Sequence, residues 1–131
     1  NVLEDILEEM EDNSVPVMIN AGRTGDASAL GRIIGGKEHP LILEGVVFET
    51  LAEAVSVMKK HSNIYVETHS LLVPGGLRFL VDQVGADRII FGSDCPRSSL
   101  GGALRYIKDS GISDEDMSKV LGGNIKRLLG G

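Results

Sequence analysis

Tryptophan is absent from this 131-residue chain, and aromatic residues make up only 4% of it. The core must therefore be built from aliphatic side chains and methionine. The single cysteine, Cys95, excludes an internal disulfide framework and a cysteine-rich zinc site. No run approaches the roughly 18 uninterrupted apolar residues of a membrane-spanning helix, and no N-terminal segment reads as a signal peptide. We expect no membrane partner and, because lone thiols suit a reducing compartment, a cytoplasmic protein.

Basic residues are fewer than acidic ones. The chain has 19 acidic and 13 basic residues, which gives a formal net charge of −6. Such a surface repels phosphate backbones, so nucleic acid is not an expected partner. Cys95 has no histidine base beside it in the sequence, and we interpret it as an ordinary thiol rather than a nucleophile.

Four short apolar runs rich in β-branched residues predict strands near residues 15–20, 40–47, 63–68 and 88–94. None alternates between apolar and polar positions, which is typical of parallel strands buried on both faces. They begin near residues 15, 40, 63 and 88, so the repeat is about 25 residues, the length of a compact βα unit.

Helical periodicity fills the spaces between these runs. Thr50 and Glu53 have the spacing of a capping box, and Ser113 is placed to cap another helix. The helices are expected over residues 27–34, 51–60, 77–84, 100–108, 114–121 and 124–129. The chain is therefore predicted to be one α/β domain, residues 1–131, of (βα)4 form with four parallel strands and flanking helices.

Two architectures fit four such units. One is a small open sheet with helices on both faces, and the other is half of an eight-stranded TIM-type barrel. The glycine-containing turn at residues 20–25 matches neither common phosphate-binding motif. The chain opens at Asn1, without an initiator Met, on an amphipathic helix over residues 3–10, so we expect either a start there or a fragment of a longer protein.

Polar side chains stand where the predicted strands end. Asn20, Glu44, Glu67, His69 and Asp94 would share the rim at the carboxyl ends of a parallel sheet. Such a rim could hold a divalent cation and activate water. The alternative is that these carboxylates cap helices or pair with nearby arginines. His39 and His61 precede strands and fall at the opposite end, where we assign them no chemical role.

Three segments carry a family resemblance. They are NIYVETHS (residues 63–70), GADRIIFGSDCP (85–96) and LGGNIKRLLG (121–130), and in this order and spacing they resemble the C-terminal part of the amidohydrolase-related (amidohydrolase 2) family of metal-dependent barrel hydrolases. VPVMINAG (15–22) and HPLILEG (39–45) match the family's fifth and sixth strands more loosely. The resemblance implies that the four strands are the last four of an eight-stranded barrel.

That family holds its metal with a His-x-His pair on strand one, histidines on strands five and six, and an aspartate on strand eight. Asp94 matches the aspartate, which also serves as general base. Asn20 and Glu44 stand where the two later histidines are expected, and the strand-one pair has no counterpart. The resemblance therefore implies Asp94 as catalytic residue, and Asp94 and Glu44 as ligands of zinc or manganese. Asn20 and His69, which stand at the ends of predicted strands, are the expected substrate-binding residues.

The expected function is that of an amidohydrolase-family half-barrel acting on a small carboxylate, amide or lactone, with impaired catalysis by itself. The alternatives are a non-catalytic, self-assembling half-barrel and a small-molecule binding module. A half-barrel exposes an apolar sheet face and two strand edges, so we expect a homodimer or higher even oligomer through that face. We expect this face to carry Val17, Ile19, Ile42, Tyr65 and Ile90, or their neighbours of opposite parity. A monomer covered by the helix over residues 3–10 is the competing solution.

Overall fold

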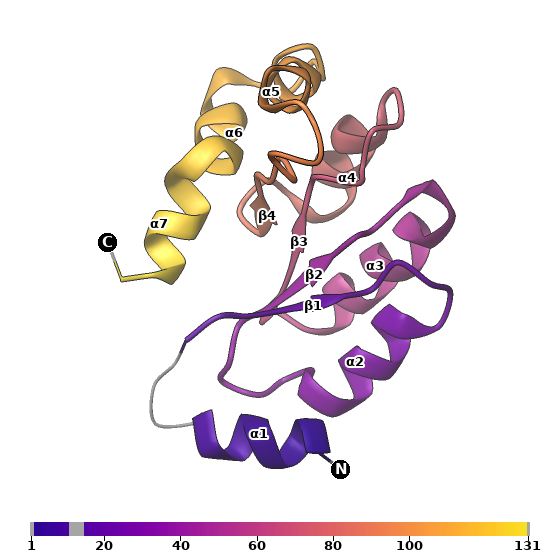
Figure 1. Cartoon of the computed structure of the whole chain (residues 1–131), viewed down its shortest axis with the longest axis vertical. Helices are drawn as coiled ribbons and strands as arrows, with labels where there is room; N and C mark the ends of the chain where they lie inside the picture. The colour runs from indigo at the N-terminus through magenta and orange to yellow at the C-terminus, as the bar shows by residue number, and fades with distance from the viewer. Residues whose placement is uncertain (1, 11–14, 131) are drawn as a thin grey trace.

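The computed structural model describes residues 2–10 and 15–130, and a four-stranded parallel sheet lies at its centre (Figure 1). The strands are β1 (Val17–Asn20), β2 (Leu41–Glu44), β3 (Ile64–Glu67) and β4 (Ile89–Ile90). They pair in the order β1-β2-β3-β4, so each strand lies beside the next one along the chain. A doubly wound sheet reverses its strand order, whereas a barrel adds strands in sequence. The predicted (βα)4 arrangement of a TIM-type half-barrel is confirmed.

Helices connect the strands and continue beyond the sheet. They are α1 (Val2–Met10), α2 (Asp26–Ile34), α3 (Phe48–Lys60), α4 (Gly76–Val84), α5 (Leu100–Lys108), α6 (Asp114–Ser118), the π-helical turn η2 (Lys119–Gly123) and α7 (Asn124–Leu128). In Figure 1, α2, α3 and α4 follow one another along one side of the sheet, and α5 to α7 gather beyond β4. Ser113 caps α6, as predicted, by accepting a hydrogen bond from Asp116 N.

The strands are shorter than the apolar runs that predicted them, and β4 departs most. It contains two residues, although the run continued to Asp94. Phe91 N donates to Val120 O of η2, and Gly92 N donates to Thr68 Oγ1. The backbone after Ile90 therefore bonds to a helical turn and to a side chain instead of continuing the ladder.

The predicted capping box of α3 is wrong. The helix begins three residues earlier than expected, with Val47 at the N-cap position and Thr50 in the first turn. Thr50 Oγ1 accepts a hydrogen bond from Val47 N at 3.1 Å. Glu53, the other half of the predicted box, instead accepts from Gly25 N and Ser28 N at the start of α2. A contact between neighbouring βα units thus replaces the local one.

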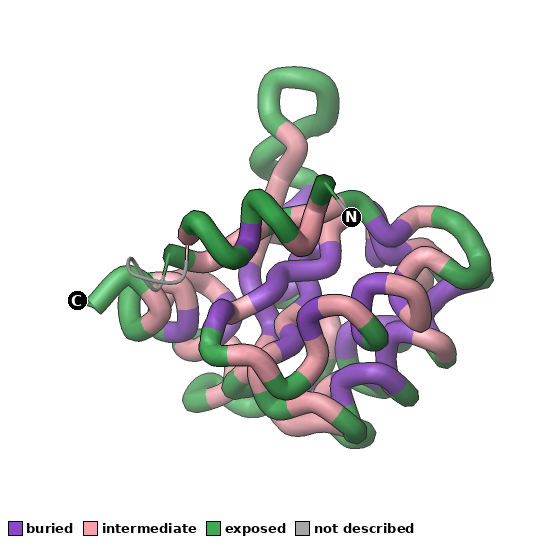
Figure 2. Tube along the Cα trace, turned by 90° about the horizontal axis from the view of Figure 1, so that it is seen from below, coloured by how far each residue is buried: buried purple, intermediate pink, exposed green. Residues whose placement is uncertain are grey.

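One face of the sheet packs under the helices and joins the main core, whereas the second face does not join that core. The register places Leu41, Leu43, Ile64, Val66 and Ile89, with Val17 and Ile19, on the helix-covered face, where they join the main core. Figure 2 shows the buried segments gathered in the middle of the trace. The second face carries Met18, Ile42, Tyr65 and Ile90. The predicted inner face is therefore corrected: Val17 and Ile19 do not share a face with Ile42, because paired residues of adjacent strands point to the same side.

The predicted N-terminal helix is present as α1, but only part of its apolar stripe is buried. Leu7 is buried in the core, whereas Ile6 is 51% and Val2 is 74% exposed.

Within residues 2–10 and 15–130, no helix is both long enough and apolar enough to cross a bilayer.

Candidate active site

The carboxyl ends of three strands bring polar side chains to one edge of the second face. Asn20 pairs in register with Glu44, at the ends of β1 and β2. Glu67 ends β3 and pairs with Ile90 of β4. Each of the three polar residues lies two positions after a residue of the second face, so all three side chains point to that side of the sheet. We call this edge, together with His69 and Asp94, the rim.

Glu67, His69 and Glu44 come together at the rim. His69 N donates to Glu67 Oε1 at 2.7 Å, and the Nδ1 atom of the same histidine contacts Glu67 Oε2. The other ring nitrogen, Nε2, lies 4.0 Å from Glu44 Oε1. The side chain of Glu67 is 5% exposed, that of His69 17% and that of Glu44 36%. The imidazole thus lies between a buried carboxylate and one that faces solvent.

Sequence reasoning singled out His69 but assigned no role to Glu67. The buried carboxylate fits because residue 92 has no side chain: a Cβ there would lie 1.5 Å from Glu67 Oε1. Gly92 N is held by Thr68 Oγ1 at 3.2 Å, which fixes the two strand ends side by side. The signal in the sequence was a glutamate two residues before a histidine, but its contact with Gly92 spans 25 residues and could not be read from either segment.

Asn20 is tied into the turn that follows β1. Its Oδ1 accepts a hydrogen bond from Gly22 N at 3.1 Å. Gly45, at the end of the neighbouring strand, has φ +75°, and a Cβ there would lie 2.5 Å from Asn20 Nδ2. The amide is therefore held at the rim by two glycine-containing turns, with one of its oxygen lone pairs already used by the backbone.

Asp94 lies in the connection between β4 and α5. Its backbone is left-handed, with φ 53°, a conformation that aspartate adopts more readily than most residues. Its side chain is 31% exposed, and Oδ2 lies 3.7 Å from Arg97 Nε. Ser99, which accepts from Gly102 N, is the N-cap of α5, so Asp94 is not the capping residue of that helix. Its carboxylate is accessible from solvent.

The donor set does not make a complete metal centre by itself. Within residues 2–10 and 15–130, no group of three or more His, Cys, Asp or Glu side chains is arranged to hold a metal ion. Glu44 lies close to His69, and Asp94 pairs with Arg97. Asn20 supplies an amide oxygen, which zinc binds poorly. The assignment of Glu44 and Asp94 as metal ligands stays a prediction.

The remaining candidates are a thiol next to Asp94 and two histidines outside the rim. Cys95 is exposed, and its N–H donates to Ser93 Oγ. His61 follows the last residue of α3, and His39 lies two residues before β2. His39 is buried, and neither of its ring nitrogens has a hydrogen-bond partner in the described part of the chain. Both histidines are at the amino ends of the strands, opposite the rim.

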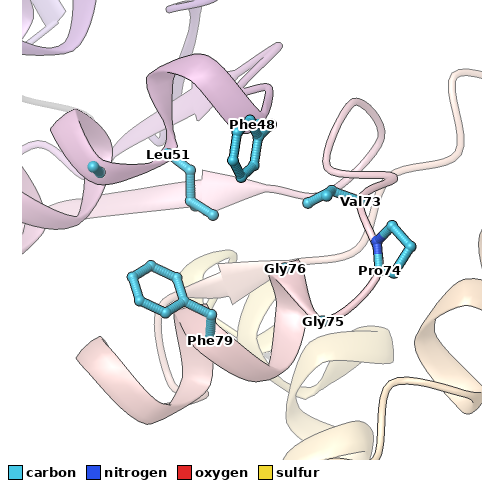
Figure 3. A pocket seen from close by; sticks show the side chains of 8 residues that line it. Phe48, Leu51, Val73, Pro74, Gly75, Gly76 and Phe79 are labelled. Atoms are coloured by element: carbon cyan, nitrogen blue, oxygen red, sulfur yellow. The ribbon is translucent and has the colours of Figure 1, made fainter.

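An apolar pocket lies apart from the rim, between the first turns of α3 and α4 (Figure 3). Phe48 and Leu51 approach it from α3, Phe79 from α4, and Val73 and Pro74 from the loop that precedes α4. Its volume is about 280 Å3. Ligand sites combine apolar walls with a few polar groups that orient the ligand. No charged side chain lines this pocket, so the rim is the better candidate for chemistry.

Comparisons with known structures agree with this architecture. A dihydroxybenzoic acid decarboxylase from Polaromonas sp. JS666, solved with manganese and the inhibitor 2-nitroresorcinol, superposes with a TM-score of 0.75 at 17% identity, over 97% of this chain and 53% of that one. An uncharacterised TIM-barrel protein from Bordetella bronchiseptica gives 0.80 at 23% identity, over 98% and 50%. A putative amidohydrolase from Staphylococcus aureus gives 0.73 at 14% identity, over 97% and 58%.

The chain thus spans about half the length of the solved structures it matches. At these identities the superpositions establish the TIM-barrel type of fold and nothing finer. A comparison with curated proteins found no match. The sequence matches the family model described as amidohydrolase over residues 3–131, nearly its whole length, and the chain belongs to the amidohydrolase family.

Proposed function

We propose that this chain is the C-terminal (βα)4 half of an amidohydrolase-family enzyme that acts on a small carboxylate, amide or lactone. The observation that carries the proposal is the rim: Glu44, Glu67 and His69 converge at the carboxyl ends of parallel strands, and an accessible Asp94 follows β4. In βα barrels this end of the strands is where catalytic residues gather. The decarboxylase from Polaromonas shares the fold, and its substrate class is one member of this range.

Within that function, Asp94 is the proposed general base. Its carboxylate is a third exposed and can accept a proton from an attacking water. Asn20 and His69 are the proposed substrate-binding residues. The amide of Asn20 is fixed by the turn at Gly22, and the ring of His69 is fixed by Glu67, so both present polar atoms in set directions.

A divalent metal, zinc or manganese, is the proposed cofactor of the complete enzyme, with Glu44 and Asp94 as the ligands supplied by this chain. Two carboxylates are too few for a tight site, since structural and catalytic metal centres use three or four protein ligands. Metal binding by the 131-residue chain is therefore expected to be weak. The chemistry that this chain supplies by its own residues is proton acceptance at Asp94 and substrate binding at Asn20 and His69.

Catalysis by the isolated chain is accordingly proposed to be impaired. The test is turnover of a panel of small amides, lactones and aromatic carboxylic acids with Zn2+, with Mn2+ and with a chelator, paired with metal analysis of the purified protein. We expect turnover that is slow at best, and less than one tightly bound metal per chain. Robust metal-dependent turnover would contradict the impairment, and it would point to ligands that the rim does not reveal.

The second face provides a specific reason to propose self-association as well. Met18 is 51% exposed on that face, and β1 has an unpaired edge within the described sheet. A second copy that meets this face and edge would form a homodimer or higher even oligomer. Sedimentation velocity should show twice 14.0 kDa or more. Met18→Glu should dissociate the assembly, whereas Phe48→Glu, a matched change at an exposed residue of α3, should leave it intact. A wild-type species of 14.0 kDa at micromolar concentration would rule the oligomer out.

A cytoplasmic location is part of the same proposal. It is supported by the single cysteine, which is exposed and has no cysteine partner in the sequence. Fractionation of cells that produce the protein, probed with an antibody to it, would test this, and recovery outside the cytoplasmic fraction would contradict it.

A further inference from the structure

Glu67 uses both of its carboxylate oxygens on one residue. Oε1 accepts the backbone N–H of His69 at 2.7 Å, while Oε2 contacts Nδ1 of the same residue's ring. The glutamate side chain is 5% exposed and that of the histidine 17%, so water has little access to compete for either contact. Rotation of the imidazole would leave a buried carboxylate oxygen without its donor, which is costly. The ring is therefore held in one orientation.

This geometry also determines where the ring carries its proton. An ionised carboxylate accepts hydrogen bonds and donates none, so Nδ1 must carry the hydrogen that lies between it and Oε2. In a neutral imidazole the other nitrogen, Nε2, is then a bare acceptor. Glu44 Oε1, at 4.0 Å, is too far away for a hydrogen bond with Nε2. The lone pair of Nε2 is thus left for a group that enters the rim.

We infer that Glu67 is a positioning residue that fixes the ring of His69 with a hydrogen on Nδ1, so that in the neutral ring Nε2 is presented to the rim as a hydrogen-bond acceptor. The inference rests on the proposed function only in that the rim binds a substrate. A group that contacts Nε2 must bring its own hydrogen, so an amide N–H or a hydroxyl meets His69. A bare carboxylate or the ring of a lactone, which only accept hydrogen bonds, would be received elsewhere at the rim. His69 thereby favours amides and hydroxyl-bearing acids within the proposed substrate range.

The experiment is a long-range 1H–15N NMR correlation of the imidazoles, recorded at a pH where the rings are neutral. The chain has three histidines, which His→Gln variants would assign. His69 should show a protonated Nδ1 and an unprotonated Nε2, the opposite of the tautomer that prevails for a free imidazole in water. His61, which precedes the same strand, serves as the control within each spectrum.

Glu67→Gln is a sharper test, because the glutamine side chain keeps the shape of glutamate and replaces one carboxylate oxygen with an NH2 group. The Gln oxygen is needed by the backbone N–H of His69, so the amide NH2 must face Nδ1. Nδ1 then becomes the acceptor, and the hydrogen should move to Nε2. A role for Glu67 in packing alone would not move it. The signals of His61 and His39 should stay where they are in the wild-type spectrum.

Gly92→Ala is the second variant, because the added Cβ would displace Glu67 without altering its chemistry. We expect the tautomer of His69 to shift towards that of a free imidazole. Wild-type protein that shows His69 protonated on Nε2, or Glu67→Gln that leaves the tautomer unchanged, would overturn the inference. None of these measurements depends on turnover, so a failed search for activity would count against the proposed function and leave this result standing.

Discussion

Polar side chains at the two ends of the sheet are used in different ways. At the amino ends, they bond to main-chain carbonyls from several segments. Arg88 Nη1 donates to Met58 O, His61 O and Ile64 O at 2.8 to 3.0 Å. Asn63 Nδ2 reaches Ile34 O and His39 O, and Asn124 Nδ2 reaches Ala86 O and Ile89 O. At the carboxyl ends, Glu44, Glu67 and His69 instead approach one another.

The difference places stabilising side chains at one end of the sheet and the proposed site at the other. A side chain whose N–H groups bond to buried carbonyls stabilises the fold, because an unsatisfied buried backbone group is costly. Those N–H groups are then not available to a ligand. A rim carboxylate or imidazole with an unused lone pair has capacity for a ligand. The same sheet therefore separates the residues that hold it together from those proposed to act on a substrate, as in complete βα barrels.

The largest effect should come from the amino end. Arg88→Met keeps the aliphatic stem but removes three hydrogen bonds, and we expect the free energy of unfolding to fall by about 3 kcal/mol. Urea denaturation measures this. Arg105→Met is the control, since Arg105 pairs with Asp109 on an exposed surface, where solvent screens the ion pair and its loss should change stability far less. Equal losses in the two variants would remove the structural role of Arg88.

A smaller effect on the free energy of unfolding is expected at Gly45, which lies at the rim next to Asn20. Gly45→Ala combines a left-handed backbone with a clash against Asn20, whereas Gly36→Ala has a similar φ of +80° and open space around it. We expect losses of about 2 and 1 kcal/mol in urea denaturation. The side-chain amide signals of Asn20 should shift only in Gly45→Ala. A shift in both variants, or in neither, would show that Gly45 does not position Asn20.

The smallest effect concerns Glu53, a residue on the rim side that supports the fold. The N–H of Gly25 holds the pKa of Glu53 below its ordinary value of 4.5. A folded pKa below the unfolded one gives stability that is present above about pH 4.5 and is lost as the pH falls through the folded pKa. Glu53→Gln should lower stability slightly at pH 7 and flatten the acid limb of a pH series of urea denaturations. Glu49→Gln, on the exposed surface of α3, is the control, and identical acid limbs for Glu53→Gln and wild type would contradict the role.

Local patterns predicted the repeating units well. The four apolar runs contain the four strands, and the helix over Leu100–Lys108 was expected with the bounds that α5 has. Ser113 was identified as a cap because its hydroxyl acts within one turn. These features depend on residues that are close in the sequence, where periodicity and capping are decisive.

Contacts between units could not be predicted in this way. Thr50 was expected at a helix start, but the helix extends back to Phe48, while Glu53 caps a different helix. The end of β4 is determined by Val120, thirty residues along the chain. At the rim, the polar strand ends were recognisable, but the role of Glu67 depends on the space left by Gly92. Such features follow from tertiary packing, which a pattern within one segment does not encode.

Asp94→Asn tests most directly the claim that stabilising residues and proposed catalytic residues lie at opposite ends of the sheet. Its turnover should be measured beside its free energy of unfolding, with the substrate panel and metals used for the wild type. Because Asp94 is partly exposed and is not the cap of α5, the account predicts that any turnover of the wild type is lost while stability changes by less than about 0.5 kcal/mol. Turnover that survives the substitution, or a loss of stability comparable to that of Arg88→Met, would contradict it.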